Sequence, residues 1–326
     1  MKKLVNTLKL LGLFLFSLCI YSYAQAQEME ESPSASYGCQ SMIAPLVKVV
    51  VKRPDSAFAV ADPLKWHYTS SPNLSVAQAE HDEFVKILLE KGIEVHYHDA
   101  YLPELADSIF VHDPVIITKK GAIVLRMGKA LRRGEEEAIE KKLHSLGLPT
   151  FFKLDGDATA EGGDFLWLDE QTLAIGHSFR TNIEGIRQVR NAVADLGIKV
   201  VEVDLPHGDG EASCLHLQSL ISLVDEKVAL VFLPLLPVSF VKQLKESGFQ
   251  LIEVPLIEFL TMGSNVLALS PGVCLTTQDN PITKKRLEEA GIEVITYKGD
   301  EISLKAEGGA TCLTRPLLRR TQKLAK

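Results

Sequence analysis

A unit in which a helix ends at a glycine and a strand follows at once recurs five times in this 326-residue chain. The glycines lie about 50 residues apart, a period typical of repeat architectures. Each follows a stretch with helical apolar spacing, and glycine is common there because it adopts a left-handed backbone without steric cost. The five glycines and their strands are Gly92 with 93–97, Gly147 with 148–152, Gly197 with 198–202, Gly248 with 249–253, and Gly291 with 292–296.

A polar or glycine-containing turn and an apolar hairpin follow each strand, as at 115–117 with 122–125. The fifth unit begins at Gly308-Gly309 and has an incomplete hairpin, whereas the N-terminal strand 46–51 has no partner. Five ββαβ units closed by that first strand predict an α/β propeller with five blades and pseudo-five-fold symmetry. Such a ring leaves few open sheet edges, places its helices outside and brings equivalent turns together on its central axis.

A doubly wound Rossmann sheet is the alternative fold. That fold needs a GxGxxG motif between a strand and a helix. No such motif occurs, and Gly208-Asp209-Gly210 lacks the strand, loop and helix around it. The propeller therefore ranks first.

Composition limits the partners of the chain. With 46% apolar and 24% charged residues it is typical of a soluble globular protein. The net charge of -7 argues against nucleic acid and against anionic membrane surfaces, because both require a basic patch. The oligomeric state is left open.

The N-terminal residues 1–26 read as a signal peptide. Lys2 and Lys3 precede an apolar run at 10–20, and Ala24-Gln25-Ala26 supplies small residues for cleavage near Ala26. The run is short for an uncleaved anchor, and bulky Leu18 disfavours a lipoprotein signal at Cys19. We expect export to the periplasm or medium, with a flexible tether at 27–43, a catalytic domain at 44–318 and a basic tail at 319–326.

Four cysteines remain after cleavage: Cys39, Cys214, Cys274 and Cys312. An oxidising compartment could pair an even number of them. Their spacing is not that of a disulfide scaffold, and no CxxC pair indicates zinc. Cys312 is expected to be a free thiol.

The turns before the hairpins carry polar residues that a ring would bring together: Asp113, Glu161 with Asp164, His216, Asn265 and Cys312. A thiolate nucleophile, a histidine that transfers protons and a carboxylate that orients it are the parts of a cysteine hydrolase. The register therefore predicts this chemistry on the axis.

Structural interpretations compete with each of these functional ones. Cys312 could be an inert cysteine beside a Gly-Gly turn, and His216 a core histidine in a strand. Glu161 and Asp164 could be turn residues. Other side chains have their own alternatives: His96 and His98 alternate on one strand face as metal ligands would but lack a third ligand, and Arg132 with Arg133 could begin a solvated helix.

At these residues the chain resembles the guanidine-modifying superfamily of arginine deiminases, amidinotransferases and dimethylargininases, and is most similar to the dimethylargininases. The match runs in order from about residue 44 to 315, and the family's five-bladed α/β propeller, the pentein type, agrees with the repeats. The segments that carry it are 107–113 (DSIFVHD), 126–133 (RMGKALRR), 161–164 (EGGD), 176–182 (GHSFRTN), Leu215-His216-Leu217 and 308–312 (GGATC).

The resemblance implies a hydrolase that acts on the guanidinium carbon of arginine-type substrates, converting dimethylarginine to citrulline and dimethylamine without a metal or organic cofactor. It implies Cys312 as the nucleophile, with a low pKa, His216 as the general acid and base, and Glu161 as its partner. It further implies that Asp107 and Asp113 hold the guanidinium and that Arg132 and Arg180 grip the substrate α-carboxylate.

Two departures from the family pattern bear on the substrate. Arginine deiminases and amidinotransferases carry an aspartate where this chain has Gln218, and dimethylargininases usually carry a glutamate where it has His112. Fewer acids would favour dimethylarginine over arginine. Arginine deimination, citrulline hydrolysis and a non-catalytic binding module remain as alternatives.

Overall fold

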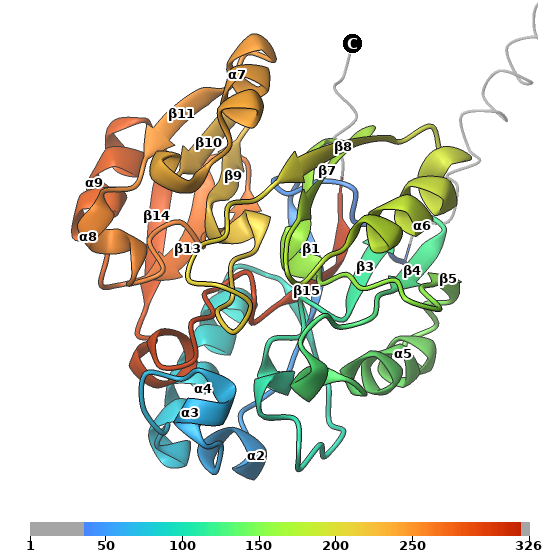
Figure 1. Ribbon diagram of the computed structural model, residues 1–326. Helices are drawn as coiled ribbons and strands as arrows, with labels where there is room; N and C mark the ends of the chain where they lie inside the picture. The colour runs from blue at the N-terminus through green and yellow to red at the C-terminus, as the bar shows by residue number, and fades with distance from the viewer. Residues whose placement is uncertain (1–35, 321–326) are drawn as a thin grey trace, which may run out of the picture. The chain divides into compact units, whose positions relative to one another are not determined.

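The computed structural model describes residues 36–320, in which fifteen strands form five separate three-stranded sheets (Figure 1). In every sheet the middle strand is antiparallel to one neighbour and parallel to the other. The sheets, with the middle strand second, are β15 (Arg315–Arg319), β1 (Leu46–Val51) and β2 (Glu94–Tyr97); β3 (Val115–Thr118), β4 (Gly121–Val124) and β5 (Thr150–Lys153); β6 (Phe165–Asp169), β7 (Thr172–His177) and β8 (Lys199–Asp204); β9 (Ile221–Asp225), β10 (Val228–Val231) and β11 (Gln250–Glu253); β12 (Leu267–Ser270), β13 (Val273–Thr277) and β14 (Glu293–Tyr297). The predicted five-bladed α/β propeller is confirmed.

The helices lie at the periphery of the ring of sheets (Figure 1). One longer helix precedes the outer strand of each blade, and three short helices lie in the connections. They are α2 (Ser56–Ala59), α3 (Pro63–Trp66), α4 (Leu74–Glu90), α5 (Glu135–Ser145), α6 (Ile183–Ala194), α7 (Val238–Glu246), α8 (Leu256–Phe259) and α9 (Pro281–Glu289). Along residues 36–320, no helix combines the length and apolar character that a membrane crossing needs.

The five repeat glycines have positive φ angles between 70° and 86°. A β-carbon added at any of them would meet no atom within 4 Å, so backbone conformation rather than lack of space requires glycine there. This confirms the reading of each as the residue that ends a helix.

The first and last strands close the ring. β1 pairs antiparallel with β15, with Leu46 opposite Arg319 and Val50 opposite Arg315, and it pairs parallel with β2. The N-terminal strand therefore completes the fifth hairpin as predicted. The amide of Gly38 also donates to the carbonyl of Leu317 at 2.8 Å, so the paired structure extends on both sides of the predicted 44–318 domain. The predicted signal peptide, 1–26, lies outside the described residues, and the expected export stays a prediction.

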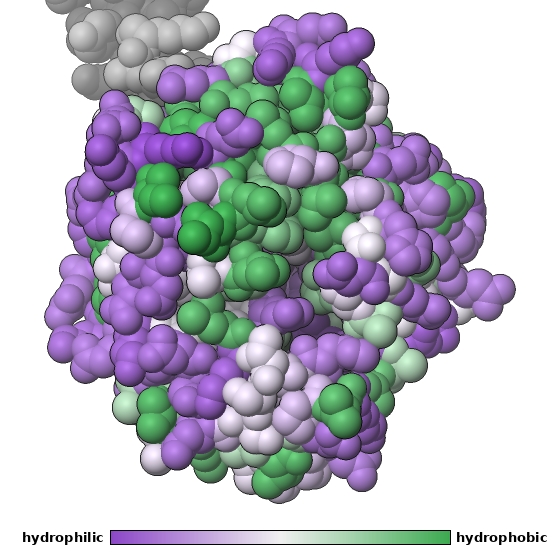
Figure 2. All heavy atoms as spheres, turned by 60° about the vertical axis from the view of Figure 1, so that its left-hand side comes forward, coloured by the Kyte–Doolittle hydropathy of each residue, from purple (hydrophilic) through white to green (hydrophobic). Residues whose placement is uncertain are grey.

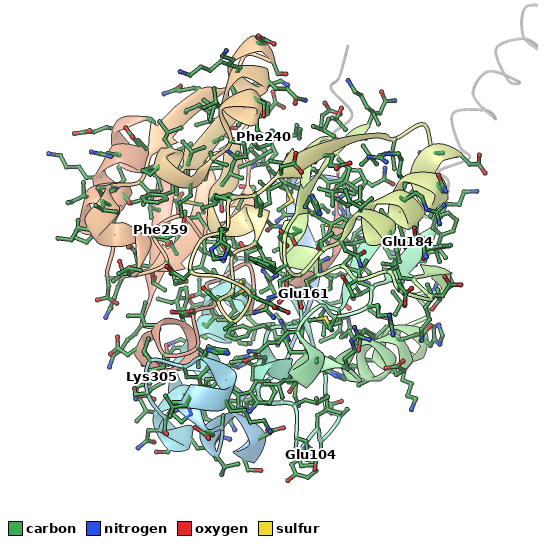
Figure 3. The ribbon with its side chains drawn as sticks, viewed as in Figure 1. Glu104, Glu161, Glu184, Phe240, Phe259 and Lys305 are labelled. Atoms are coloured by element: carbon green, nitrogen blue, oxygen red, sulfur yellow. The ribbon has the colours of Figure 1, made fainter. Side chains whose placement is uncertain are left out.

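Apolar clusters fill the space between sheets and helices. Phe84 of α4 is fully buried and its ring meets that of Tyr297, on β14 of the adjacent blade, at 4.9 Å. Phe240 of α7 is buried in the same way against its own sheet (Figure 3). These contacts fix the blades, and with them the turns that carry the polar residues.

Candidate active site

All seven residues predicted to form the site line one narrow cavity of about 40 Å³. They come from turns that are far apart in the sequence, and Glu161 lies near the middle of the molecule in Figure 3. The residues are Asp107, Asp113, Arg132, Glu161, Arg180, His216 and Cys312. The repeat register predicted that Asp113, Glu161, His216 and Cys312 meet, and the resemblance supplied Asp107, Arg132 and Arg180.

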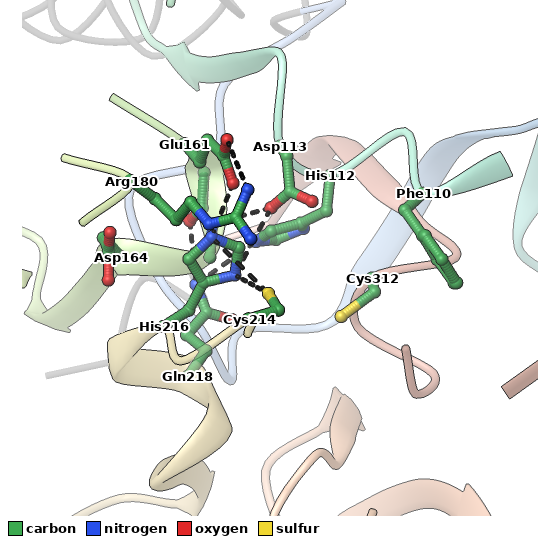
Figure 4. A network of polar contacts seen from close by, with 12 residues as sticks. Phe110, His112, Asp113, Glu161, Asp164, Arg180, Cys214, His216, Gln218 and Cys312 are labelled. Carbon is green, nitrogen blue, oxygen red and sulfur yellow. Dashed lines mark hydrogen bonds and ion pairs between the residues drawn. The ribbon is translucent and has the colours of Figure 1, made fainter. Parts of the chain in front are cut away.

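His216 and Glu161 line this cavity and form a buried ion pair (Figure 4). The Nε2 atom of His216 donates to Glu161 Oε2 at 2.8 Å, and the other carboxylate oxygen accepts the amide of Lys129 at 2.8 Å. Burial opposes the charge on His216, but Cys214, Asp113 and the bond to Glu161 outweigh it and raise the pKa of His216 well above its ordinary value. The imidazole is thus held in its protonated form.

His216 precedes a 3-10 turn, η4 (Leu217–Ser219), and is not in a strand, which corrects the core-strand interpretation. The buried carboxylate of Asp164 accepts the Leu217 amide at 2.9 Å and the Ser178 hydroxyl at 2.7 Å. Asp164 therefore holds the turn that presents His216 rather than contacting its ring.

Two of the glycines near the site are required by close approach. A β-carbon on Gly163 would overlap the ring of His216, and one on Gly309 would lie 2.7 Å from Asn265 Oδ1. Neither glycine has a positive φ. The Gly-Gly pairs before Asp164 and before Cys312 let neighbouring turns pack directly on the functional side chains.

Replacing Gly163 with alanine should displace the imidazole, because the methyl group occupies its place. We expect kcat to fall by about 10²-fold, the usual cost of a displacement near 1 Å in a catalytic group. The free energy of unfolding should fall by only about 1–3 kcal/mol. Steady-state kinetics together with urea unfolding separate the two effects, and an unchanged kcat would show that the ring position is not critical.

Cys312 is half-buried, and its Sγ accepts the side-chain amide of Asn265 at 3.1 Å. Asn265 in turn accepts the Thr311 amide at 3.1 Å, so the fourth and fifth turns are locked together. Burial, together with Asp113 and Cys214, raises the pKa of Cys312 to about 12. The low pKa expected for this thiol is therefore wrong for the protein without a bound cation.

A second thiol, not predicted for the site, contacts the histidine. Cys214 is exposed, and its Sγ lies 3.5 Å from His216 Nδ1 (Figure 4). In the sequence, only its position two residues before His216 indicated that Cys214 could lie at the site. All four cysteines in residues 36–320 are free thiols.

Arg132 and Asp113 form a buried network with Glu135, the first residue of α5. Arg132 donates to both oxygens of Glu135 at 3.0 and 2.8 Å and to Asp113 Oδ2 at 2.6 Å. The fork of Arg132 is thus already occupied, and Arg132 does not begin a solvated helix. Asp113 Oδ1 accepts the Gly163 amide at 2.9 Å, and a carboxylate has about four acceptor positions, so Asp113 can still accept from a ligand.

Arg180 has more unused donors than Arg132. One of its terminal nitrogens donates to the Ser213 carbonyl at 3.1 Å, and the other lies 4.0 Å from Glu161. Its buried Nε has no partner in the described structure. Of the two predicted carboxylate clamps, Arg180 is the one with donors free to bind an anion.

The negative charge of Asp107 is partly neutralised by two residues that were not predicted for the site. Tyr68 donates to one oxygen of Asp107 at 2.7 Å and Lys129 to the other at 2.6 Å. Lys129 lies three residues before Arg132 in a segment that carried the resemblance, so its position was visible but its partner was not. Asp107 thus offers the cavity less net negative charge than predicted.

His112 and Gln218 do not line the narrow cavity. The His112 ring contacts Arg315 and the Thr314 carbonyl, and burial together with Arg315 lowers the pKa of His112 to about 3. Gln218 donates to the carbonyls of Gly162 and Phe165 at 3.2 and 2.6 Å. The expectation that these two residues reduce the charge around the substrate is corrected, because both serve packing beneath the turns.

Metal ligation is not the use that this geometry indicates for the central acids. Among residues 36–320, Asp113, Glu161 and His216 lie close enough to share an ion, but main-chain amides and Arg132 already donate to the carboxylates. An exposed group of His177, Glu202 and Asp204 is the other such cluster. His96 and His98 are in neither cluster; His96 binds Glu94 at 2.8 Å.

Known proteins are similar to this chain in sequence and in fold. The family model described as N,N dimethylarginine dimethylhydrolase, eukaryotic, matches residues 64–319. The N(G),N(G)-dimethylarginine dimethylaminohydrolase of Pseudomonas aeruginosa is 26% identical over 269 residues, 82% of this chain and 97% of that protein. An arginine deiminase of Bacillus cytotoxicus is 29% identical over 290 residues, 75% of this chain and 69% of that protein. A solved mutant of the P. aeruginosa enzyme complexed with citrulline has a TM-score of 0.69 and 23% identity, and the match covers 83% of this chain and 99% of that one.

The fold and site define a hydrolase of guanidino compounds on a five-bladed α/β propeller. The chain belongs to the N,N dimethylarginine dimethylhydrolase family.

Proposed function

We propose that this protein hydrolyses dimethylarginine to citrulline and dimethylamine, with Cys312 as the nucleophile. The observation that carries the proposal is the buried His216–Glu161 pair, which shares one cavity with Cys312, Asp113 and Arg180. A protonated imidazole, a thiol and a carboxylate with free acceptor positions are the groups that amine displacement from a cationic carbon requires.

The proposed course has two stages. The Cys312 thiolate attacks the central guanidinium carbon, and the bond from that carbon to the dimethylated nitrogen breaks as His216 protonates the departing amine. Water, deprotonated by the now neutral His216, then attacks the thiouronium carbon. The carbon–sulfur bond breaks, which releases citrulline and restores the thiol. Asp113 accepts the guanidinium N–H groups throughout.

A cationic substrate would itself help to form the thiolate. Because burial and nearby Asp113 raise the pKa of Cys312 to about 12, the free thiol is protonated at neutral pH. A positive charge placed next to the sulfur stabilises the thiolate and lowers this pKa. The nucleophile would thus be activated only when a guanidinium is bound.

This idea predicts a charge-selective alkylation of Cys312. The neutral reagent iodoacetamide should label Cys312 slowly at pH 7, with the rate rising by about tenfold per pH unit as the thiolate fraction grows. The cationic 2-chloroacetamidine should label it much faster at pH 7. Mass spectrometry of peptides distinguishes Cys312 from exposed Cys214, and equal rates for both reagents would contradict the proposed activation.

Removing the Arg180 side chain should weaken binding of an amino-acid substrate. Because Arg180 has a buried, unpartnered donor, Arg180→Ala should raise KM for dimethylarginine by at least about 30-fold. Arg187→Ala is the matched control. It removes an exposed arginine that pairs with Glu184 within α6, and it should have little effect. Agmatine, which lacks the α-carboxylate, should be a poor substrate of the unmutated protein, and efficient turnover of agmatine would remove this role.

Arginine deimination is the second candidate. A methylated guanidinium has fewer N–H donors than arginine and needs fewer acceptors, and Lys129 and Tyr68 already bind both oxygens of Asp107. We therefore propose a higher kcat/KM for dimethylarginine than for arginine.

Product analysis tests the proposed function directly. Residues 27–326 would be incubated separately with dimethylarginine, arginine, agmatine and citrulline, and the released amines and ureido products identified. Dimethylamine and citrulline in equal amounts are expected from dimethylarginine. Faster ammonia release from arginine would favour the deiminase, ammonia from citrulline would favour citrulline hydrolysis, and no release from any of the four would favour a binding module.

A further inference from the structure

A second cavity, of about 320 Å³, adjoins the narrow one at the reacting groups. The two cavities share Cys214, His216, Glu307 and Cys312 in their walls. The nucleophile and the proton donor therefore face both spaces, so a substrate held in the narrow cavity can extend its reacting end into the larger one.

The larger cavity has an apolar wall. Its hydrophobic side chains are Leu215, Leu235, Phe259, Leu260 and Met262. Figure 2 shows hydrophobic residues gathered beside a hollow on the side of the molecule where β9 to β14 and α8 lie. The ring of Phe259 stacks on that of Phe232, with centroids 3.9 Å apart, which gives the wall a flat and supported surface.

Hydrogen bonds of Glu258 and Thr261, which neighbour the wall residues in sequence, hold this wall in place. The buried carboxylate of Glu258 accepts the amides of Ile282 and Thr283 at 2.7 Å each, and the Thr261 hydroxyl donates to Asn280 at 2.7 Å. Met262 adopts a positive φ of 65°, a conformation that a non-glycine residue keeps only when its surroundings enforce it. The apolar cavity is therefore built into the fold and preformed.

Charge separates the uses of the two cavities. The narrow cavity contains Lys129, Arg132 and Arg180, whereas among the described residues no lysine or arginine lines the larger one. Apart from His216, which lines both cavities, its charged lining residues are the acids Asp209 and Glu307. Because the donors that could bind an α-carboxylate, those of Arg180 above all, line only the narrow cavity, the larger cavity is left for the guanidinium end of the substrate.

We propose, resting on the proposed function, that the larger cavity receives the substituent on the departing nitrogen, and that the substrate class extends to guanidines with an apolar Nω-substituent larger than methyl. Two methyl groups leave most of this space unfilled, since an apolar cavity of about 150 Å³ already holds benzene. The chemistry is unchanged. The carbon–nitrogen bond to the substituted nitrogen breaks, His216 supplies the proton, water completes the hydrolysis, and the products are citrulline and a primary alkylamine.

A series of arginine derivatives tests this inference on the unmutated protein. Nω-methyl-, Nω,Nω-dimethyl-, Nω-butyl- and Nω-benzyl-L-arginine would be compared by amine release. The kcat/KM for the butyl or benzyl compound should exceed that for the methyl compound by at least about tenfold, because added apolar groups in a hydrophobic pocket give discrimination of this order.

Two variants locate the effect in the cavity. Leu235→Trp reduces the space, and Leu260→Lys places a cation at the rim on a residue that is 78% exposed, so it should not disturb folding. Each should lower the ratio of kcat/KM for the benzyl over the dimethyl substrate by at least about tenfold. Leu260→Lys decides the question should Leu235→Trp fail to fold.

The possible results distinguish failure of this inference from failure of the proposed function. Hydrolysis of dimethylarginine with no hydrolysis of the bulky compounds, or with competitive inhibition by them, overturns the inference and leaves the function standing. An unchanged substrate ratio in the soluble variants also overturns it. Failure to hydrolyse any member of the series overturns the proposed function, and the inference with it.

Discussion

Cys312→Ser should lower kcat for dimethylarginine hydrolysis by roughly 10⁴- to 10⁶-fold, as removal of a covalent nucleophile does in other hydrolases. A serine hydroxyl ionises far less readily than a thiol and is a poor nucleophile without a dedicated base. The fold should be preserved, because serine is nearly isosteric and Asn265 can still donate to its oxygen. Single-turnover kinetics and circular dichroism measure the two effects separately.

Cys39→Ser is the matched control for this experiment. Cys39 is half-buried like Cys312 but lines neither the narrow nor the larger cavity. Its replacement should therefore leave kcat within about twofold, as is usual for substitutions away from a functional site. Cys214 is the alternative candidate for the nucleophile, because its sulfur lies 3.5 Å from His216 Nδ1. Loss of activity in Cys214→Ser together with an active Cys312→Ser variant would move the nucleophile to Cys214.

His216→Ala should lower kcat by about 10²- to 10⁴-fold, because the departing amine loses its proton donor. The variant should also be less stable by about 3 kcal/mol, since Glu161 is then left buried without its partner. Burial opposes the charge on Glu161, but the bond to His216 and the charge of His216 outweigh it and hold the pKa of Glu161 below its ordinary value. This stabilisation is therefore present at neutral pH and disappears as pH falls through the lowered pKa. Urea unfolding at pH 7 checks it.

His216→Gln separates catalysis from stability. Glutamine retains an N–H donor for Glu161 but cannot transfer a proton at neutral pH, so it should recover part of the stability and none of the activity. His177→Ala, which breaks a half-exposed pair with Asp204, is the control and should change neither quantity much. Recovery of turnover by His216→Gln would show that the histidine has only a structural role.

The fold was predictable because its signals are local and repeated. A glycine after each helix and an apolar strand after each glycine depend on backbone conformation alone, and five copies determine the ring. The convergence of Glu161, His216 and Cys312 then follows from equivalent positions in the repeat.

Side-chain partners were not predictable in the same way. Leu215 and Leu217 give His216 the alternation of a strand, yet Asp164, more than 50 residues away, binds the Leu217 amide and stabilises a 3-10 turn. The orientation of His112 depends on Arg315, from the other end of the chain. Such contacts join blades, and a pattern within one blade carries no information about them.

The raised pKa of Cys312 was missed for a related reason. A cysteine after two glycines indicates exposure of the sulfur, but the actual environment is set by burial and by Asp113 from another turn. The same is true of Arg132, whose fork is occupied by Glu135 only because the following helix begins there. Which residues line the narrow cavity was therefore predictable, whereas their ionisation and availability were not.

The pairing of β1 with β15 has a consequence for the timing of activity. Cys312 lies just before Arg315, where the last strand begins, and that strand is fixed by a partner near the opposite end of the chain. During synthesis Glu161 and His216 emerge long before Cys312, and contacts across such a sequence separation form late in folding. A chain that ends before the last strand thus contains Glu161 and His216, but its ring is open and Cys312 is not held in position. We therefore expect turnover to begin only when β1 pairs with β15, and incomplete chains to be inactive.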